Sequence, residues 1–169
     1  MSYEKTVWAG EGTLAREQEY NDHWCYERGI ITKAWLDVYA ATGDRRFYDA
    51  AKANVDQYVT ADGEILTYEP DKYNLDMICM GRTTLRLFKA TGEAKYEKAC
   101  RRLIEQIKGQ PTTAEGGFWH KKLYPQQMWL DGIYMACPFL TEFAVTFGEM
   151  QWADLAAKQM ELIFEKTRL

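Results

Sequence analysis

The chain has 169 residues, of which 47% are apolar and 27% charged, with a formal net charge of −4. This apolar fraction excludes a disordered chain, and the longest apolar runs are too short to span a membrane. A mildly acidic chain lacks the positive field that nucleic acids and anionic membranes attract, so neither is expected as a partner. The N-terminal sequence lacks the basic start and apolar stretch of a secretion signal, which predicts a cytoplasmic protein.

Cysteine and histidine usage argues against a metal site. The cysteines stand singly, and no two have metal-binding spacing; they are Cys25, Cys79, Cys100 and Cys137. We therefore expect buried, reduced thiols, no metal and no cofactor. A nucleophilic serine motif is absent, and Gly10-Glu11-Gly12 is not followed by the third glycine of a dinucleotide site.

The chain reads as three pairs of helices behind an irregular segment over residues 1–20. The first helix of each pair is apolar around most of its circumference, which predicts burial on several sides, over 30–41, 77–90 and 132–146. The second helix of each pair has one apolar and one polar face, over 47–59, 96–107 and 152–164. Gly43, Gly92 and Gly148 separate the two members of each pair, as glycine suits a helix C-terminus.

A second glycine set, Gly29, Gly81 and Gly132, opens the buried helices and recurs about every 50 residues. Alternating buried and exposed helices predict an all-α fold of the α/α-toroid type, here one domain over 1–169 with about three helical hairpins. An open solenoid is the alternative. The long loops, over 60–75 and 109–130, all precede buried helices, so they gather at one end, where function is usually placed.

These loops carry the candidate chemistry. If the hairpins surround an axis, Asp76 and Asp131 converge with His120 and several rings. Taken singly, each acid could be a helix N-cap, the histidine structural and the rings packing. Together, two carboxyl groups in an aromatic cleft are typical of glycoside chemistry. Asp131 stands between apolar neighbours, so we expect it to be desolvated and to serve as a general acid.

Several strings then resemble glycoside hydrolase family 105, the unsaturated rhamnogalacturonyl hydrolases. They are Gly-Gly-Phe-Trp-His-Lys at 116–121, Gln-Met-Trp-Leu-Asp-Gly-Ile-Tyr-Met-Ala-Cys-Pro-Phe at 127–139, Tyr-Asn-Leu-Asp at 73–76 and Met-Gly-Arg at 80–82. The resemblance covers the chain from about residue 20. It implies an (α/α)6 barrel that removes 4,5-unsaturated galacturonic acid from the non-reducing end of rhamnogalacturonan (pectin) oligosaccharides. The reaction is acid-catalysed hydration of the vinyl ether double bond.

The resemblance also implies residue roles. Asp131 carries over as general acid and then base, and Asp76 as the second catalytic acid. The residues expected to bind substrate are His120, Trp129, Trp24, Tyr26, Trp119 and Met77. Arg28 and Arg82 are the nearest basic candidates for a substrate carboxylate.

The chain departs from the family in length, with three hairpins where the family has six. We therefore expect an N-terminal half, truncated at the C-terminus, whose open edge drives self-association or binds a complementary second half. Two other functions stay open. One is a different glycosidase or a sugar epimerase on the same toroid, and the other is a non-catalytic carbohydrate-binding module of helical repeats.

Overall fold

The computed structural model describes residues 3–15 and 23–168, and within those ranges the regular structure is helical. Three hairpins follow a single N-terminal helix, α1 (Tyr3–Leu14). The hairpins are α2 (Tyr26–Thr42) with α3 (Arg45–Asp56), α4 (Gly81–Thr91) with α5 (Ala94–Gly109), and α6 (Leu130–Phe147) with α7 (Gln151–Thr167). This confirms the predicted all-α fold of three hairpins. In the described ranges, no helix combines the length and apolarity needed to cross a membrane.

Each hairpin turns at the predicted glycine. Gly43, Gly92 and Gly148 have left-handed φ values of 74°, 71° and 70°, which only glycine adopts without strain. Their N–H groups donate to the carbonyl oxygens of Tyr39, Phe88 and Ala144. The turns therefore end α2, α4 and α6 and reverse the chain within two or three residues.

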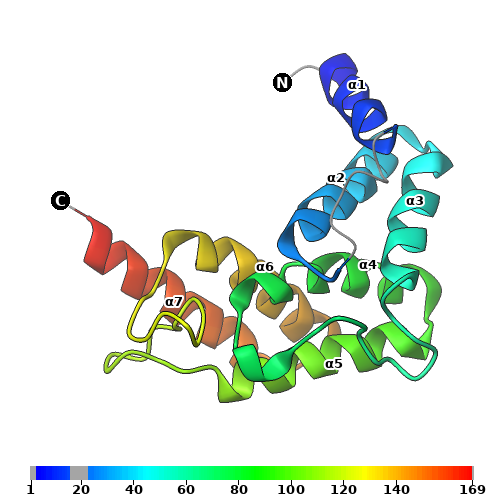
Figure 1. Cartoon of the computed structure of the whole chain (residues 1–169). Helices are drawn as coiled ribbons and strands as arrows, with labels where there is room; N and C mark the ends of the chain where they lie inside the picture. The colour runs from blue at the N-terminus through cyan, green and yellow to red at the C-terminus, as the bar shows by residue number, and fades with distance from the viewer. Residues whose placement is uncertain (1–2, 16–22, 169) are drawn as a thin grey trace.

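The helices form two layers. Helix α4 packs against α2 on one side and α6 on the other, whereas α3, α5 and α7 pack mainly on their own hairpin partners. Arg86 links the inner layer, with its guanidinium 2.7 Å from Asp37 of α2 and 3.7 Å from Glu142 of α6. The hairpins succeed one another in space, so α1 and α7 lie at opposite ends of the array (Figure 1).

The second glycine set lets the inner helices approach closely at the end that carries the long loops. A Cβ on Gly29 would stand 2.9 Å from the backbone of Cys79, and one on Gly81 would stand 2.7 Å from the Phe139 ring. The predicted helix over 77–90 begins later, because Leu75–Ile78 form a separate 3-10 helix, η3. That break leaves Asp76 outside α4, beside the next loop.

The prediction of an irregular segment over 1–20 is wrong for residues 3–14, which form α1; residues 16–20 lie outside the described ranges. Two glycines lower the intrinsic helix propensity of this stretch and hide it in the sequence. Tertiary contacts stabilise it instead. Gly10 lies against Phe47 and Val38, and the Trp35 indole N–H donates to the Thr13 hydroxyl at 2.8 Å.

The outer side of the last hairpin is apolar and exposed. Leu130 and Val145 of α6 are 66% and 70% exposed, and Phe164 of α7 is 63% exposed. Tyr134 and Met160 extend the same stripes, and a groove between the two helices joins them. We name this surface, made of Leu130, Tyr134, Val145, Met160 and Phe164, the α6–α7 edge.

Candidate active site

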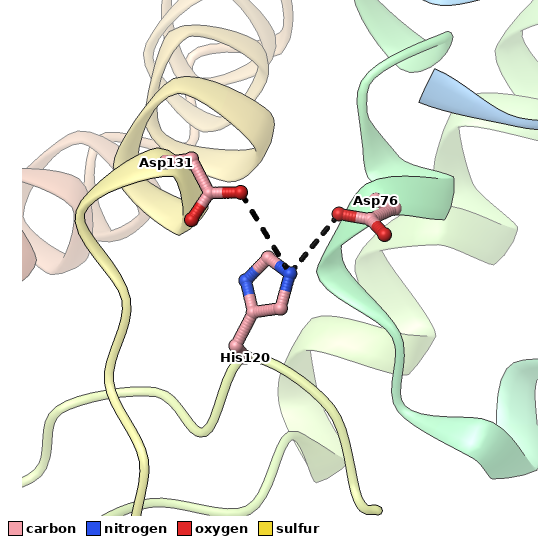
Figure 2. Close-up of side chains that lie close together, drawn as sticks. All are labelled: Asp76, His120 and Asp131. Carbon is pink, nitrogen blue, oxygen red and sulfur yellow. Dashed lines mark ion pairs between the residues drawn. The ribbon is translucent and has the colours of Figure 1, made fainter. Parts of the chain in front are cut away.

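Three segments bring together the two acids and the histidine predicted from the sequence. Asp76 lies in η3, Asp131 in the first turn of α6, and His120 in the loop between α5 and α6. The Nε2 atom of His120 stands 3.1 Å from Asp76 Oδ1 and 4.0 Å from Asp131 Oδ2. Figure 2 shows both carboxylates turned toward that one nitrogen.

Backbone hydrogen bonds fix this arrangement. The N–H of His120 donates to the Gln127 carbonyl at 2.8 Å, and the His120 carbonyl accepts from Leu75 N–H at 3.0 Å. The Asn74 side chain caps η3 by accepting from the Asp76 N–H. The loop of His120 is therefore tied to the segments on both sides. The caps are Asn74 and Trp129, so the N-cap reading of the two acids is wrong.

The histidine is held in a stack of rings. His120 and Trp129 are almost parallel, with centroids 4.5 Å apart, and Tyr124 stacks on Trp129 at 4.9 Å. His120 is buried, and its Nδ1 has no hydrogen-bond partner within the part of the chain that the structure describes. Trp129 thus orients the imidazole, and its remaining exposed area can face a ligand.

The two acids have different surroundings. The Asp76 side chain is 12% exposed, and its second oxygen, Oδ2, lies 2.6 Å from Lys121 Nζ. Burial alone would raise the pKa of Asp76, but the hydrogen bonds from His120 and Lys121 outweigh it and hold the pKa below its ordinary value. Asp131 is 54% exposed, so the predicted desolvation of this acid is wrong. It lies in the first turn of α6, next to Leu130 of the exposed α6–α7 edge.

The predicted binding residues differ in how far they are buried. Tyr26 and Met77 are half-buried, and the Tyr26 phenol lies within electrostatic range of Asp76. Trp24 is fully buried and donates its indole N–H to the Met77 carbonyl at 2.7 Å, so its predicted contact with a sugar is wrong. Trp119 is half-buried, and its indole N–H lacks a partner among the described residues.

Sequence reasoning missed two contributors and left the basic residues open. Lys121 stood in the quoted Phe-Trp-His-Lys string, and Tyr124 in no motif at all. Arg28 is buried, with its guanidinium 5.2 Å from the centre of the Tyr58 ring, so it belongs to the core. Arg82 lies 5.6 Å from the centre of the Tyr134 ring, one helical turn beyond Asp131.

Asp76, His120 and Asp131 are also spaced closely enough to surround a cation, since one oxygen or nitrogen of each lies within 4.8 Å of the others. The Lys121 ammonium already neutralises Asp76, and a cation would have to displace the hydrogen bond from His120. The geometry therefore favours a hydrogen-bonded acid pair over a metal centre.

Comparison with known proteins agrees with this chemistry. The model of Glycosyl Hydrolase Family 88 matches residues 5–168. A solved structure of a family 105 glycoside hydrolase from C. acetobutylicum ATCC 824 is similar, with a TM-score of 0.87 and 36% sequence identity. The match covers 98% of this chain and 45% of that one, so the chain spans less than half the length of this relative. By sequence, fold and paired acids, the chain belongs to the glycoside hydrolases of the family 88 and 105 group.

Proposed function

We propose that this chain supplies the acid pair of a hydrolase that removes 4,5-unsaturated galacturonic acid from rhamnogalacturonan oligosaccharides. The single observation that carries the proposal is the convergence of Asp76 and Asp131, with unlike surroundings, on His120. A role in pectin breakdown and a cytoplasmic location are part of the proposal.

The two acids divide the work in this scheme. Asp131, the accessible acid, donates a proton to C4 of the vinyl ether double bond, and positive charge develops at C5. Water then adds at C5 while the Asp131 carboxylate takes one of its protons, so the acid is regenerated. The resulting hemiketal opens, and the bond to the leaving sugar breaks. Asp76 stays ionised and accepts a hydrogen bond that orients the sugar or the water.

The short separation of the acids argues against inverting hydrolysis, and it is shared by retaining glycosidases, whose carboxyl groups lie about 5–5.5 Å apart. An inverting glycosidase holds its carboxyl groups about 6.5–9.5 Å apart to leave room for water. Here one oxygen of Asp76 and one of Asp131 lie within 4.8 Å. Hydration uses one acid for both proton transfers, so it does not need that gap.

We also propose that further helices of the same fold complete the site by packing on the α6–α7 edge. Each earlier hairpin is followed by another that packs on it, and this edge is where the next would lie. The relative of known structure, more than twice as long, has the additional chain to provide such helices. In the isolated chain, we expect a second copy to cover the edge.

The activity test uses lyase-digested rhamnogalacturonan and follows the ultraviolet absorbance of the conjugated double bond. We expect the absorbance to fall with the chain, and to stay constant with Asp131→Asn. Asp154→Asn, an exposed acid in the first turn of α7, is the matched control and should behave as the parent. Release of saturated sugar at constant absorbance would contradict hydration and favour the alternative glycosidase.

Sedimentation velocity tests the edge. The parent chain should sediment as an associating species whose size grows with concentration. Val145→Glu places a charge on the exposed stripe and should shift the chain toward monomer. A parent chain that is monomeric at every concentration would contradict association through this surface.

A further inference from the structure

We propose that Lys121 is a positioning residue of this site, whose ammonium fixes the orientation and negative charge of Asp76. The inference rests on the proposed function for its catalytic consequence, but the contact itself can be tested without substrate.

The geometry gives each oxygen of Asp76 its own partner. Oδ1 accepts from Nε2 of His120 at 3.1 Å, and Oδ2 lies 2.6 Å from the ammonium of Lys121. The two partners are consecutive residues of one loop, so a single backbone segment holds both ends of the carboxylate. With both oxygens engaged and the side chain largely buried, Asp76 cannot rotate freely.

Lys121 supplies a permanent charge in this clamp, and His120 supplies a hydrogen bond. Nδ1 of His120 has no partner in the described structure, whereas Nε2 stands 3.1 Å from Asp76 Oδ1, so Nε2 is the nitrogen that donates to Asp76. The lysine ammonium lies 2.6 Å from the other oxygen and places its charge directly beside the carboxylate.

Three further groups near Asp76 in the described part of the chain are acidic or polar. Asp131 of α6 approaches it across His120, the Tyr26 phenol at the start of α2 lies within electrostatic range, and the Cys79 thiol follows η3. None of these three can carry a positive charge. The hydrogen bonds to Asp76 from His120 and Lys121 lower its pKa against the opposing effect of burial.

This clamp matters for an acidic substrate. An unsaturated uronic acid brings its own carboxylate to a site that already holds two acids. Lys121 cancels the charge of Asp76, which reduces the repulsion that the incoming carboxylate meets. Removal of the ammonium should therefore weaken substrate binding more than it slows proton transfer.

The direct test is a carboxyl 13C NMR titration of Asp76, assigned with Asp76→Asn. The Asp76 midpoint should rise by about one pH unit in Lys121→Met and in Lys121→Gln, and return toward the parent value in Lys121→Arg. Lys122→Met is the matched control, because Lys122 is exposed and its ammonium lies 3.5 Å from the Asp71 carbonyl rather than from an acid. A midpoint that does not move in the folded Met and Gln variants would overturn the proposal.

The kinetic test separates positioning from a structural role. Lys121→Met should raise KM for the unsaturated uronic acid substrate about tenfold and change kcat less, with partial rescue by Lys121→Arg. A fall in kcat with unchanged KM would overturn the substrate-binding part of the proposal. If the NMR midpoint shifts but even the parent chain leaves the double bond intact, the proposed reaction fails and the clamp stands.

Discussion

Gly132 lies directly against His120: a Cβ at position 132 would stand 3.2 Å from the imidazole Nδ1. The Leu75 side chain would also stand 3.2 Å from that Cβ. The imidazole of His120 thus packs against the backbone of Gly132, the glycine at the start of α6. Its recurrence with Gly29 and Gly81 reflects the same close approach in all three hairpins.

We expect Gly132→Ala to reduce activity much more than stability. Alanine is favoured over glycine within a helix by about 0.5–1 kcal/mol, which offsets the cost of a tight contact. The imidazole must nevertheless shift by a few tenths of an ångström, and kcat/KM should fall about tenfold or more. Kinetics and the melting temperature measure the two effects. Gly12→Ala in α1, where a Cβ would meet nothing within 4 Å, should leave activity unchanged.

The opposite balance is expected for Gly81→Ala. Its Cβ would stand 2.7 Å from the Phe139 ring and 2.8 Å from Leu103, and all of these groups are buried. Overpacking of this kind costs about 1–3 kcal/mol, so the free energy of unfolding should fall by that amount. Chemical denaturation measures it. A variant as stable as the parent would show that α4 and α6 have room for a methyl group between Gly81 and Phe139.

Particular residues show what the sequence could predict. Helix periodicity and the turn glycines at 43, 92 and 148 were sufficient for the three hairpins, because both signals are local. The proximity of Asp76 and Asp131 was predictable because the loops that carry them lie at the same end of the hairpins. The clamp by Lys121 was not predictable, since the backbone hydrogen bonds that His120 accepts from Leu75 and donates to Gln127 set the conformation of its loop.

The burial of individual aromatic residues was not predictable from the sequence either. Trp24 and Trp129 are both predicted from the sequence to bind substrate, yet one is fully buried and the other 38% exposed. Composition and residue spacing do not distinguish a buried tryptophan from an exposed one, because packing against distant segments determines the burial. Helix α1 was missed for a related reason, because contacts from α2 and α3 stabilise it rather than its own propensity.

Stability should depend on pH through Asp56, which joins the first two hairpins. Its carboxylate accepts from the Tyr96 hydroxyl and lies near Lys52 and Lys95, each at 2.7 Å. Burial would raise the pKa of Asp56, but these hydrogen bonds lower it. The folded pKa lies below the unfolded one, so the contribution is complete above about pH 4 and is lost as the pH falls through the folded value.

Asp56→Asn should therefore lower the free energy of unfolding by about 1–2 kcal/mol near neutral pH, and progressively less in acid. Denaturation of both proteins across pH 2–7 measures the difference. Asp49→Asn removes an exposed acid of α3 that pairs with Arg45 at the surface, and it should cost less than about 0.5 kcal/mol. A constant difference between parent and Asp56→Asn at all pH values would contradict the role of charge.

Trp24→Phe tests whether a buried indole outside the site positions it. The variant keeps an aromatic ring but loses the hydrogen bond to the Met77 carbonyl, the residue that follows Asp76. We expect a loss of about 1–3 kcal/mol in stability and a several-fold fall in kcat/KM, because η3 is no longer anchored to the start of α2. Trp8→Phe, at a position 76% exposed in α1, should change neither quantity. If Trp24→Phe loses stability but keeps full kcat/KM, the anchor is structural only, and Asp76 is held by His120 and Lys121 alone.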